Sequence, residues 1–597
     1  MTELLVVMVT GLVVIAAATV AGPRLGIAAP LVLVTIGVGA SFLPVFGSAH
    51  IEPEWILEGV LPPLLYSSAV SMPAMNFRRE FGAISGLSVA LVVGTALGLG
   101  LFFMYAVPGL GFAYGVALGA IVSPTDAVAT SIVKQTSVSQ RVVAMLDGES
   151  LLNDATALVL LRTAIVATAA TFSFWDAAGT FAWSVVVALL VGGLAGRLNL
   201  VVRRRVTDPA VNTVISFTVP FLASVPATLL GGSGLVAAVV AGLVTGIRAP
   251  RDLSPQNRLS DTQNWRTAEL VLEGAVFLTM GLQIKAIVAD VEQDHAGVGT
   301  AVLVAAGALV LTVLVRAAYV TLLLAALARR ARHGAGMRPM LQDMHEKLGT
   351  SEGKQEAFKE VNSRRRREPS ERDLDLFSRR VIMGLATIDY FLRQPLGRRE
   401  GIAVVWAGMR GAVTVAAAQT LPEDTPQRPV LVLVAFAVAA LSLLVQGGTI
   451  GPLLRRIAPA ADQAALAARR AEERDRLFAL LRTSSESVPA PASLSTPPPL
   501  SASPSLSTLA SPSASPPLSA SPSLSASASP SASPSVSAPT ERDFTAAKEH
   551  RLAVLAAQRA ALLDARDHGT FDAEVLTDAL ATLDATQIDL ELRGKLA

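Results

Sequence analysis

Two aspartates in apolar segments are the residues of this sequence whose type and position most clearly indicate a chemical function. Asp126 lies in GAIVSPTDAVATSIV and Asp154 in LDGESLLNDATALVLL. A carboxylate at the centre of a bilayer costs roughly 2.5–3.5 kcal/mol, so such residues are kept where they bind an ion, carry a proton or neutralise a buried cation. Other apolar segments also hold charged residues, namely Glu149, Arg162, Glu273, Arg316 and Arg410. Together these residues indicate a polar pathway through a membrane protein.

The segment GESLLND concentrates oxygen ligands on a predicted helix. Ser150 and Asp154 are four residues apart and share one helix face, while Glu149 and Asn153 share the adjacent face. Hard oxygen ligands suit hard cations. A polar contact between helices would account for Ser150 and Asn153, but it accounts poorly for two carboxylates. The pattern therefore favours a cation site.

Two segments carry signals that break a helix at membrane depth. Pro124 interrupts SPTD, and glycines flank Arg410 in GMRG. Broken helices are tolerated there only inside a protein-lined cavity, and in transporters their freed backbone groups bind ions. We therefore predict inverted repeats with two broken crossing helices. Arg410 stays charged, so we expect a buried carboxylate beside it. For Glu273 and Arg316 we expect structural ion pairs.

Composition supports a multi-pass membrane protein. The 597 residues are 52% hydrophobic, with a mean hydropathy of +0.51. There is no cysteine, HExxH or GxxxxGK[ST] pattern, so we expect no disulfide, no cofactor and no ATP-driven step. We also expect no nucleic-acid partner.

Apolar runs long enough to span a membrane predict about thirteen transmembrane helices, at 4–21, 27–46, 55–74, 82–107, 111–133, 141–171, 179–201, 210–227, 232–248, 266–288, 297–328, 400–421 and 428–454. We interpret the first run as a retained helix, because a signal peptide would begin with basic residues.

Loop charges predict the topology of a membrane domain over residues 1–457. Alternate loops are rich in Lys and Arg, which places the N-terminus outside and the C-terminus in the cytoplasm. We expect the polar stretch 329–399 to be a cytosolic loop. Apolar residues at helical spacing predict an amphipathic helix within it, through Val381, Ile382, Leu385, Ile388 and Leu392.

The sequence beyond the last predicted span changes character three times. Residues 458–482 read as a charged helix, and 483–540 are a Ser/Pro/Ala-rich linker predicted to be disordered. Residues 541–597 predict a helical cytosolic tail.

Six motifs in order resemble one family. The chain is similar to the monovalent cation/proton antiporters of the first cation–proton antiporter family, which includes bacterial sodium/proton antiporters and animal sodium/hydrogen exchangers. The matches are LPPLLY at 61–66, SPTDAVA at 123–129, GESLLNDATALV at 148–159, EGAVFLTMGL at 273–282, GMRGAVTVA at 408–416 and VQGGTIGPLL at 445–454. The sequence departs from the family at Ser67, where bacterial relatives often carry an acidic residue.

The resemblance implies a role for each motif residue. Asp154 would bind the cation and the proton, with Asp126, Thr125 and Ser150 completing a Na⁺ site. Glu149 and Arg410 would form a structural ion pair supported by Asn153. It also implies a homodimer in the plasma membrane, in which a core domain moves against a dimerisation domain.

These observations predict an antiporter rather than an enzyme. We expect exchange of Na⁺, with K⁺ and Li⁺ as alternatives, for H⁺ by an elevator-type movement that regulates intracellular pH and sodium. Asn153 beside Asp154 leaves one titrating carboxylate, which favours electroneutral 1:1 exchange. An intramembrane aspartyl protease would need a GxGD-type loop at its aspartates, and neither has one. A passive cation channel is the other alternative, and uncoupled flux would favour it.

Overall fold

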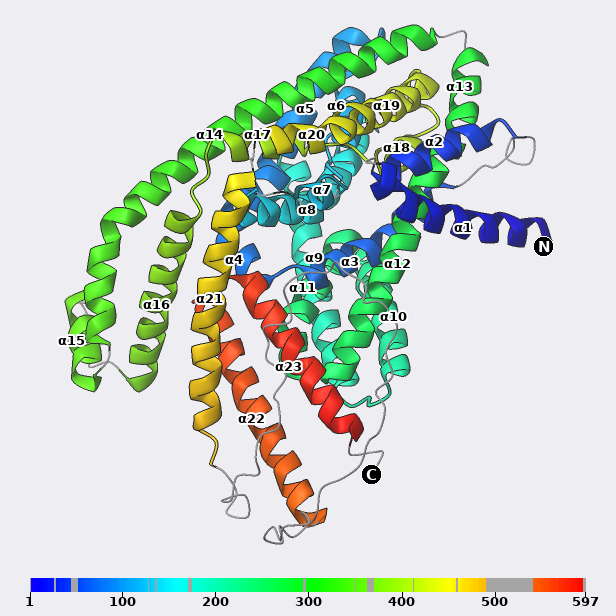
Figure 1. The fold of residues 1–597 in the computed structure, drawn as a ribbon. Helices are drawn as coiled ribbons and strands as arrows, with labels where there is room; N and C mark the ends of the chain where they lie inside the picture. The colour runs from blue at the N-terminus through cyan, green and yellow to red at the C-terminus, as the bar shows by residue number, and fades with distance from the viewer. Residues whose placement is uncertain are drawn as a thin grey trace. The chain divides into compact units, whose positions relative to one another are not determined.

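The chain folds entirely into helices in the part that the structure describes. The computed structural model describes residues 2–593 except 26–27, 44–51, 127, 135, 137, 170–173, 294–296, 349, 362–369, 412, 458–459 and 490–540. These residues contain no β-strand, as Figure 1 shows. A helix satisfies its backbone hydrogen bonds internally, as a lipid environment requires. The predicted all-α class is confirmed.

Nine helical stretches of the described ranges are long and apolar enough to cross a membrane. They are Leu5–Gly22, Ala74–Ala106, Gln140–Thr168, Ala178–Arg203, Pro209–Leu229, Gly234–Asp252, Pro255–Gln293, Val298–Lys347 and Arg428–Ile457. Each overlaps one of the predicted spans, and two of them, Pro255–Gln293 and Val298–Lys347, extend well beyond it. The other four predicted spans, at 27–46, 55–74, 111–133 and 400–421, consist of shorter or interrupted helices. Two of these interruptions form the candidate site.

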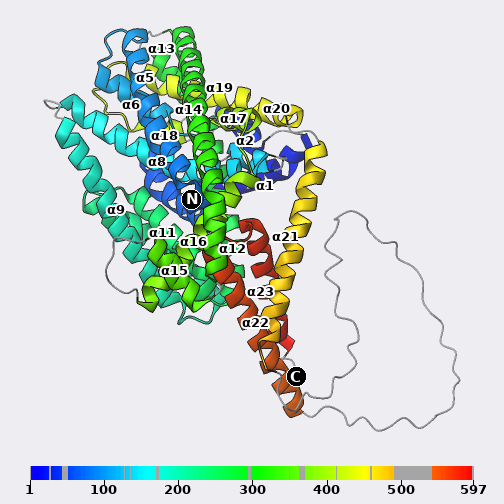
Figure 2. The same cartoon turned by 90° about the vertical axis from the view of Figure 1, so that its left-hand side faces the viewer.

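One group of helices comes from the start and the middle of the membrane region. In this group α3 packs on α11, α9 packs on α10 and α11, and α12 packs on α1 and α2. Figure 2 shows α9 and α11 side by side. We call this group the first bundle, and its members are α1 (Thr2–Leu25), α2 (Ala29–Ser41), α3 (Leu61–Ser71), α9 (Phe174–Arg203), α10 (Pro209–Leu229), α11 (Gly234–Asp252) and α12 (Pro255–Leu282).

A second group surrounds the two interrupted helices. Here α6 packs on α5, α8 and α19, and α18 packs on α6 and α19. A π-helical segment, Gly86–Leu91, joins α4 to α5, and another, Leu443–Gly447, joins α19 to α20. We call this group the second bundle, and its members are α4 (Ala74–Ser85), α5 (Val92–Ala106), α6 (Phe112–Val122), α7 (Val128–Lys134), α8 (Gln140–Ala169), α17 (Arg398–Trp406), α18 (Val413–Gln419), α19 (Arg428–Ser442) and α20 (Gly448–Ile457).

The polar stretch predicted as a loop is largely helical. After the short α13 (Ile284–Gln293), α14 runs without a break over Val298–Lys347, nineteen residues past the predicted end of its span at 328. Alanine, leucine and arginine favour helix, so charge alone does not end it. The amphipathic α16 (Glu371–Arg393) begins at a capping box formed by Ser370 and Asp373, and it packs back on α14. Between them lies α15 (Ser351–Val361).

The C-terminal region contains three helices, α21 (Ala460–Glu486), α22 (Glu541–His568) and α23 (Ala573–Arg593). The described residues of 474–564 and 578–597 form a compact unit of their own. Within this unit Arg559 of α22 forms an ion pair with Asp584 of α23, at 2.6 Å. The turn Ala565–Thr577 instead belongs to the same unit as residues 1–473. Most of the predicted disordered linker, residues 490–540, lies outside the described residues.

Candidate ion-binding site at the helix crossing

Two interrupted helices meet through their backbones. The helix α6 ends at Val122, before Pro124, and the chain resumes helix at α7; α17 and α18 flank the second interruption. The amide of Asp126 donates to the carbonyl oxygen of Met409 at 2.8 Å. The Nε of Arg410 donates to the carbonyl oxygen of Val122 at 3.0 Å. Each break thus satisfies polar groups freed by the other, and the predicted crossing of two broken helices is confirmed.

Glycines allow this close approach. A Cβ on Gly411 would lie 1.7 Å from Oδ2 of Asp126, and a Cβ on Gly408 would lie 2.6 Å from Nε of Arg316. Real Cβ atoms do not approach other atoms this closely, so neither position accepts a larger residue without movement. The two glycines that signalled a broken helix in the sequence therefore also make room for a carboxylate and a guanidinium.

The ion pair inside the crossing differs from the predicted one. Glu149 binds Arg316 of α14 through two hydrogen bonds: Nη2 to Oε2 at 2.8 Å and Nη1 to Oε1. Both side chains are 2% exposed, and fork-to-fork geometry makes such a pair strong. The predicted Glu149–Arg410 pair is therefore wrong, while the ion pair expected for Arg316 exists with Glu149 as its partner.

Arg410 is satisfied by carbonyl groups instead of a carboxylate. Its guanidinium donates to the backbone oxygens of Val122, Ser123 and Gly408, and its own amide donates to Oγ of Ser442 at 2.9 Å. Carbonyls at the end of a broken helix carry partial negative charge. The expectation of a carboxylate beside Arg410 overlooked this source of acceptors.

Asn153 and Thr125 connect the ion pair to the first break. Asn153 Nδ2 donates to the carbonyl oxygen of Thr125 at 3.1 Å and to its Oγ1 at 2.8 Å. The Thr125 hydroxyl in turn donates to Oε1 of Glu149 at 3.2 Å. Asn153 is fully buried, and its Oδ1 has no hydrogen-bond partner in the described structure. This chain of contacts holds the unwound backbone before Asp126 against α8.

Asp154 has a different environment from Glu149, only five residues away. Within the described ranges its carboxylate forms neither a hydrogen bond nor an ion pair, and it interacts electrostatically with the negative charge of Asp126. Asp126 itself accepts a hydrogen bond from the amide of Val128 at 3.1 Å. Asp154 borders a small cavity of about 10 Å³ between α6, α8 and α18, close to the volume that one water occupies. The other lining residues are Ala120, Ile121, Pro124, Ala157, Leu158, Leu161, Val413 and Ala417.

The remaining predicted residues take separate places. Ser150 is partly exposed on α8, one turn before Asp154. Glu273 on α12 forms no ion pair with any described residue, so the structural pair expected for it is not found there. Its charged neighbours are Asp126 and Glu269, both acidic. Ser67, the departure from the family pattern, donates from its hydroxyl to Oε2 of Glu269 at 3.4 Å.

The sequence analysis did not single out two buried ion pairs. Arg141 of α8 binds Glu80 of α4 at 2.6 Å, and both are at most 3% exposed. Arg203, at the end of α9, binds Asp261 of α12 at 3.0 Å. Both arginines lie at the ends of apolar runs. A matching acid on another helix at the same depth is the signal that could have suggested pairing.

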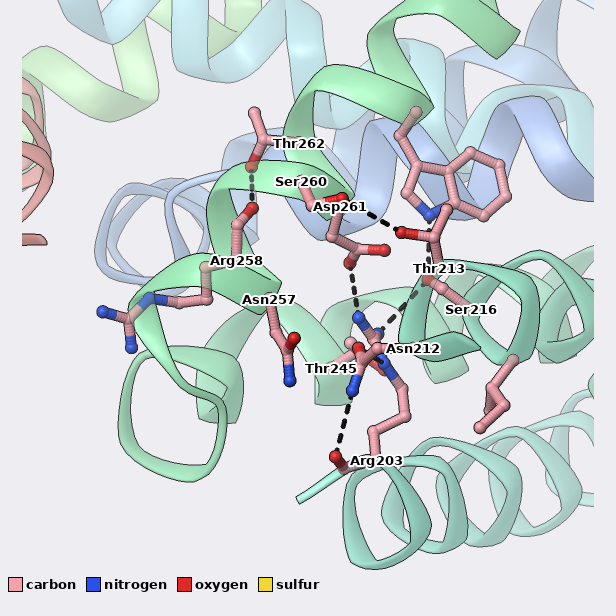
Figure 3. A network of polar contacts seen from close by, with 12 residues as sticks. Arg203, Asn212, Thr213, Ser216, Thr245, Asn257, Arg258, Ser260, Asp261 and Thr262 are labelled. Carbon is pink, nitrogen blue, oxygen red and sulfur yellow. Dashed lines mark hydrogen bonds and ion pairs between the residues drawn. The ribbon is translucent and has the colours of Figure 1, made fainter. Parts of the chain in front are cut away.

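The Arg203 network ties together the ends of three helices in the first bundle, as Figure 3 shows. Arg203 donates from Nε to Oδ1 of Asn212 at 2.7 Å and from Nη1 to Oγ of Ser216 at 3.2 Å. Trp265 donates to the same Ser216 hydroxyl at 2.9 Å. Since Arg203 is fully buried and contacts α10 and α12, it fixes the packing of α9 against both.

The fold and the site define an ion-transporting membrane protein, and comparisons with known proteins agree. The structure of the sodium proton antiporter MjNhaP1 from Methanocaldococcus jannaschii at pH 8 aligns with 76% of this chain and 99% of its own length, with a TM-score of 0.51 and 14% identity. At that identity the match shows the shared fold.

A family profile described as "Sodium/hydrogen exchanger, transmembrane" matches residues 9–341 and 376–456. The chain belongs to this family of transporters, which confirms the predicted membership.

Curated relatives carry names of the same kind. An uncharacterised Na(+)/H(+) exchanger of Escherichia coli K12 is 36% identical over 270 residues, 43% of this chain and 49% of the relative. The chain thus matches about half the length of that relative. An uncharacterised Na(+)/H(+) exchanger of Mycobacterium tuberculosis H37Rv is 26% identical over 76% of this chain and 74% of its own length. A sodium, potassium, lithium and rubidium/H(+) antiporter of Bacillus subtilis is 28% identical over 45% of this chain and 41% of its own length.

Proposed function

We propose that this chain is a secondary antiporter that exchanges a monovalent cation, foremost Na⁺, for H⁺ at Asp154. The observation that carries the proposal is the contrast between two neighbouring carboxylates. Glu149 is neutralised by Arg316, whereas Asp154 borders a cavity and has no cationic partner among the described residues. A carboxylate at membrane depth needs a neutralising partner. A proton and a cation can each supply it, so the two compete for one group.

Competition at a single carboxylate produces coupling. With either a proton or a cation bound, the site is neutral and can cross the dry barrier; the empty, charged site cannot. In this proposal Thr125, Asp126 and Ser150 contribute further oxygen ligands to the Na⁺ shell, because hard oxygen ligands suit a hard cation. The freed carbonyls of the first break can contribute further ligands.

Alternating access would come from movement of the second bundle, which holds Asp154, against the first. An apolar surface separates them, where Ile84 and Leu151 of the second bundle pack with Leu65 and Val239 of the first. Such a surface has few hydrogen bonds to break during sliding.

Exposed apolar side chains on α9 and α10, including Trp183, Leu190 and Leu222, face outward and suit lipid or a second subunit. We propose a homodimer in the plasma membrane with a role in intracellular pH and sodium balance.

The proposed stoichiometry is one proton for one cation. Glu149 is committed to Arg316, and Asn153 has no proton to exchange. One proton out for one Na⁺ in moves no net charge.

The test uses purified protein in proteoliposomes. An outward proton gradient should drive uptake of ²²Na⁺, and Na⁺, Li⁺ and K⁺ offered in turn should each dissipate the gradient to the extent that they are transported. With no ion gradient, an imposed membrane potential should drive no Na⁺ uptake. Cation flux that ignores the proton gradient would indicate a passive channel. Potential-driven exchange would show that a second proton moves, and Asp126 and Glu273 would be its candidate carriers.

A further inference from the structure

The turn between α22 and α23, Ala565–Thr577, makes polar contacts with the ends of several membrane helices, away from the candidate site. It belongs to the same compact unit as those helices. The amide of Thr570 donates to the carbonyl oxygen of Ala565 at 3.2 Å. The amide of Gly569, whose φ is +70°, donates to that of Arg566 at 3.2 Å. These two bonds end α22 in a Schellman cap, which gives the turn a defined shape. We call residues 565–577 the strap.

The helix α11 of the first bundle holds one side of the strap. Asp567 forms an ion pair with Arg251 at 2.5 Å. Nη2 of Arg566 donates to the carbonyl oxygen of Ile247 at 3.2 Å, one turn before Arg251. The side chains of Arg251 and Asp567 are 51% and 46% exposed, so water can replace each partner. This side of the strap is therefore attached at defined points but can be released.

Helices of the second bundle hold the other side. Arg79 of α4 donates to the carbonyl oxygen of Gly569. Gln140, the first residue of α8, donates to Oε2 of Glu574 at 2.9 Å, and Arg470 of α21 binds the same carboxylate oxygen at 2.9 Å. A Cβ on Gly569 would lie 2.5 Å from Nη2 of Arg79. The glycine thus serves both the positive φ and the close approach of Arg79.

The strap bridges two groups of helices whose shared surface is apolar. Arg79 and Arg251 come from the segments 75–81 and 249–265, which lie between predicted spans and whose arginines predict a cytoplasmic location. Both bundles therefore present polar groups to the strap on one predicted side of the membrane. A contact that joins both bundles stabilises the arrangement in which it forms over any other arrangement of the two.

We propose that the strap is an autoinhibitory contact: docked on α4, α8 and α11, it holds the two bundles in the arrangement seen here, and its release lets them move. This inference rests on the proposed function, in which the bundles slide past each other. Exposed ion pairs are weak, so the strap slows the conformational step without locking it. Since such steps set the maximal rate of many proteins, release of the strap raises the rate of exchange at saturating Na⁺.

Reversing one charge of the strap tests the proposal. Asp567→Arg replaces the attraction to Arg251 by repulsion. The maximal rate of ²²Na⁺ exchange in proteoliposomes should then rise about twofold to fivefold, the range that an exposed ion pair can supply. Hydrogen exchange of residues 565–577 should become faster in the same variant. Both are measured at pH 6, because burial and the charge of Asp572 raise the pKa of Glu473 to about 7, and protonated Glu473 does not repel Asp572.

A charge swap gives the sharper experiment. Arg251→Asp in the Asp567→Arg background restores the ion pair with its charges exchanged, and it should return the rate and the protection of the strap to near the wild-type values. Gly569→Ala disturbs the side held by Arg79 and should also raise the rate, which keeps the proposal testable if Asp567→Arg folds poorly. Asp343→Asn is the matched control, because it breaks an exposed ion pair with Lys347 inside α14, and it should match the wild type.

Wild-type exchange is measured first, so that its absence counts against the proposed function while hydrogen exchange reports separately on docking of the strap. With exchange established, an unchanged or lower rate in variants whose strap has lost protection overturns the inference. Protection that is the same in Asp567→Arg, Gly569→Ala and the wild type also overturns it, because these contacts would then not hold the strap. So does a charge swap that restores protection but keeps the raised rate.

Discussion

The helix crossing and the Arg203 network both bury charged side chains, yet they use them in opposite ways. Arg203 meets a carboxylate, an amide oxygen and a hydroxyl on two other helices. The crossing has an equally satisfied half, built on Glu149 and Arg316, and an unsatisfied half at Asp154. The Arg203 network therefore uses paired polar groups to fix helix positions, while the crossing keeps one carboxylate available for exchange. Buried charge alone does not mark a functional site; the absence of a fixed partner does.

The largest expected effect comes from removing the available carboxylate. Asp154→Asn should insert and fold, because an amide replaces a group that no described side chain binds, but it should abolish cation/proton exchange. Transport of ²²Na⁺ driven by a proton gradient measures the loss, and a thermal melt in detergent checks the fold. Coupled exchange above a tenth of the wild-type rate would show that the contrast between Asp154 and Glu149 has been misread.

The next effect tests the satisfied half of the crossing. Arg316→Gln leaves Glu149 buried without its cation, and breaking such a pair costs roughly 3–5 kcal/mol. We therefore expect a larger loss of thermal stability and expression than in Asp154→Asn. The double variant Glu149→Gln/Arg316→Gln should recover part of that loss, since neither charge is left alone. Equal stability of Arg316→Gln and the wild type would contradict the pairing.

The difference between these two regions also marks what a single sequence can predict. Pro124 and the glycines around Arg410 located both helix breaks, and GESLLND located Asp154 and its neighbours, because these signals are local. The partner of Glu149 was missed because Arg316 and Arg410 both lie in apolar segments of the sequence. The choice between them depends on helix rotation and on backbone acceptors that the sequence does not display. For the same reason Arg203, just beyond the predicted span 179–201, was not singled out, although it is fully buried.

A substitution at Gly411 sharpens the comparison inside the crossing. Gly411→Ala would place a methyl group against the Asp126 carboxylate, so either this side chain must turn away or the two breaks must separate. We expect the exchange rate to fall by more than tenfold, because a misplacement of about 1 Å can lower the rate about a hundredfold at other functional sites. Gly448→Ala, where a methyl group would meet no atom within 4 Å, is the control. Normal transport by Gly411→Ala would mean that the crossing tolerates rearrangement.

The Arg203 network should respond in stability and leave transport chemistry alone. Asp261→Asn weakens one contact of a buried cation that keeps Asn212 and Ser216, so we expect a loss of about 2 kcal/mol. Per folded molecule, the KM for Na⁺ and the pH dependence of exchange should match the wild type. A shifted pH profile with normal stability would mean that this network takes part in the transport cycle after all.

The smallest expected effect lies outside the membrane, where the turn Ala565–Thr577 contacts α21 at Glu473. Glu473 of α21 accepts a hydrogen bond from the amide of Asp572 at 3.0 Å. Burial and the negative charge of Asp572 raise the pKa of Glu473 to about 7, and Arg393 opposes the shift. Because the pKa is raised in the docked state, docking of the turn is favoured at acidic pH and weakens as the pH rises through about 7.

Hydrogen exchange of residues 565–577 should therefore increase from pH 6 to pH 8 by more than the intrinsic rate does. Glu473→Gln should remove that excess, whereas Glu472→Gln, at an exposed position on the same helix, should keep it. Removal of residues 483–597 should leave exchange measurable and shift only its pH response. An equal excess in Glu473→Gln and the wild type would show that another group controls the docking of this turn.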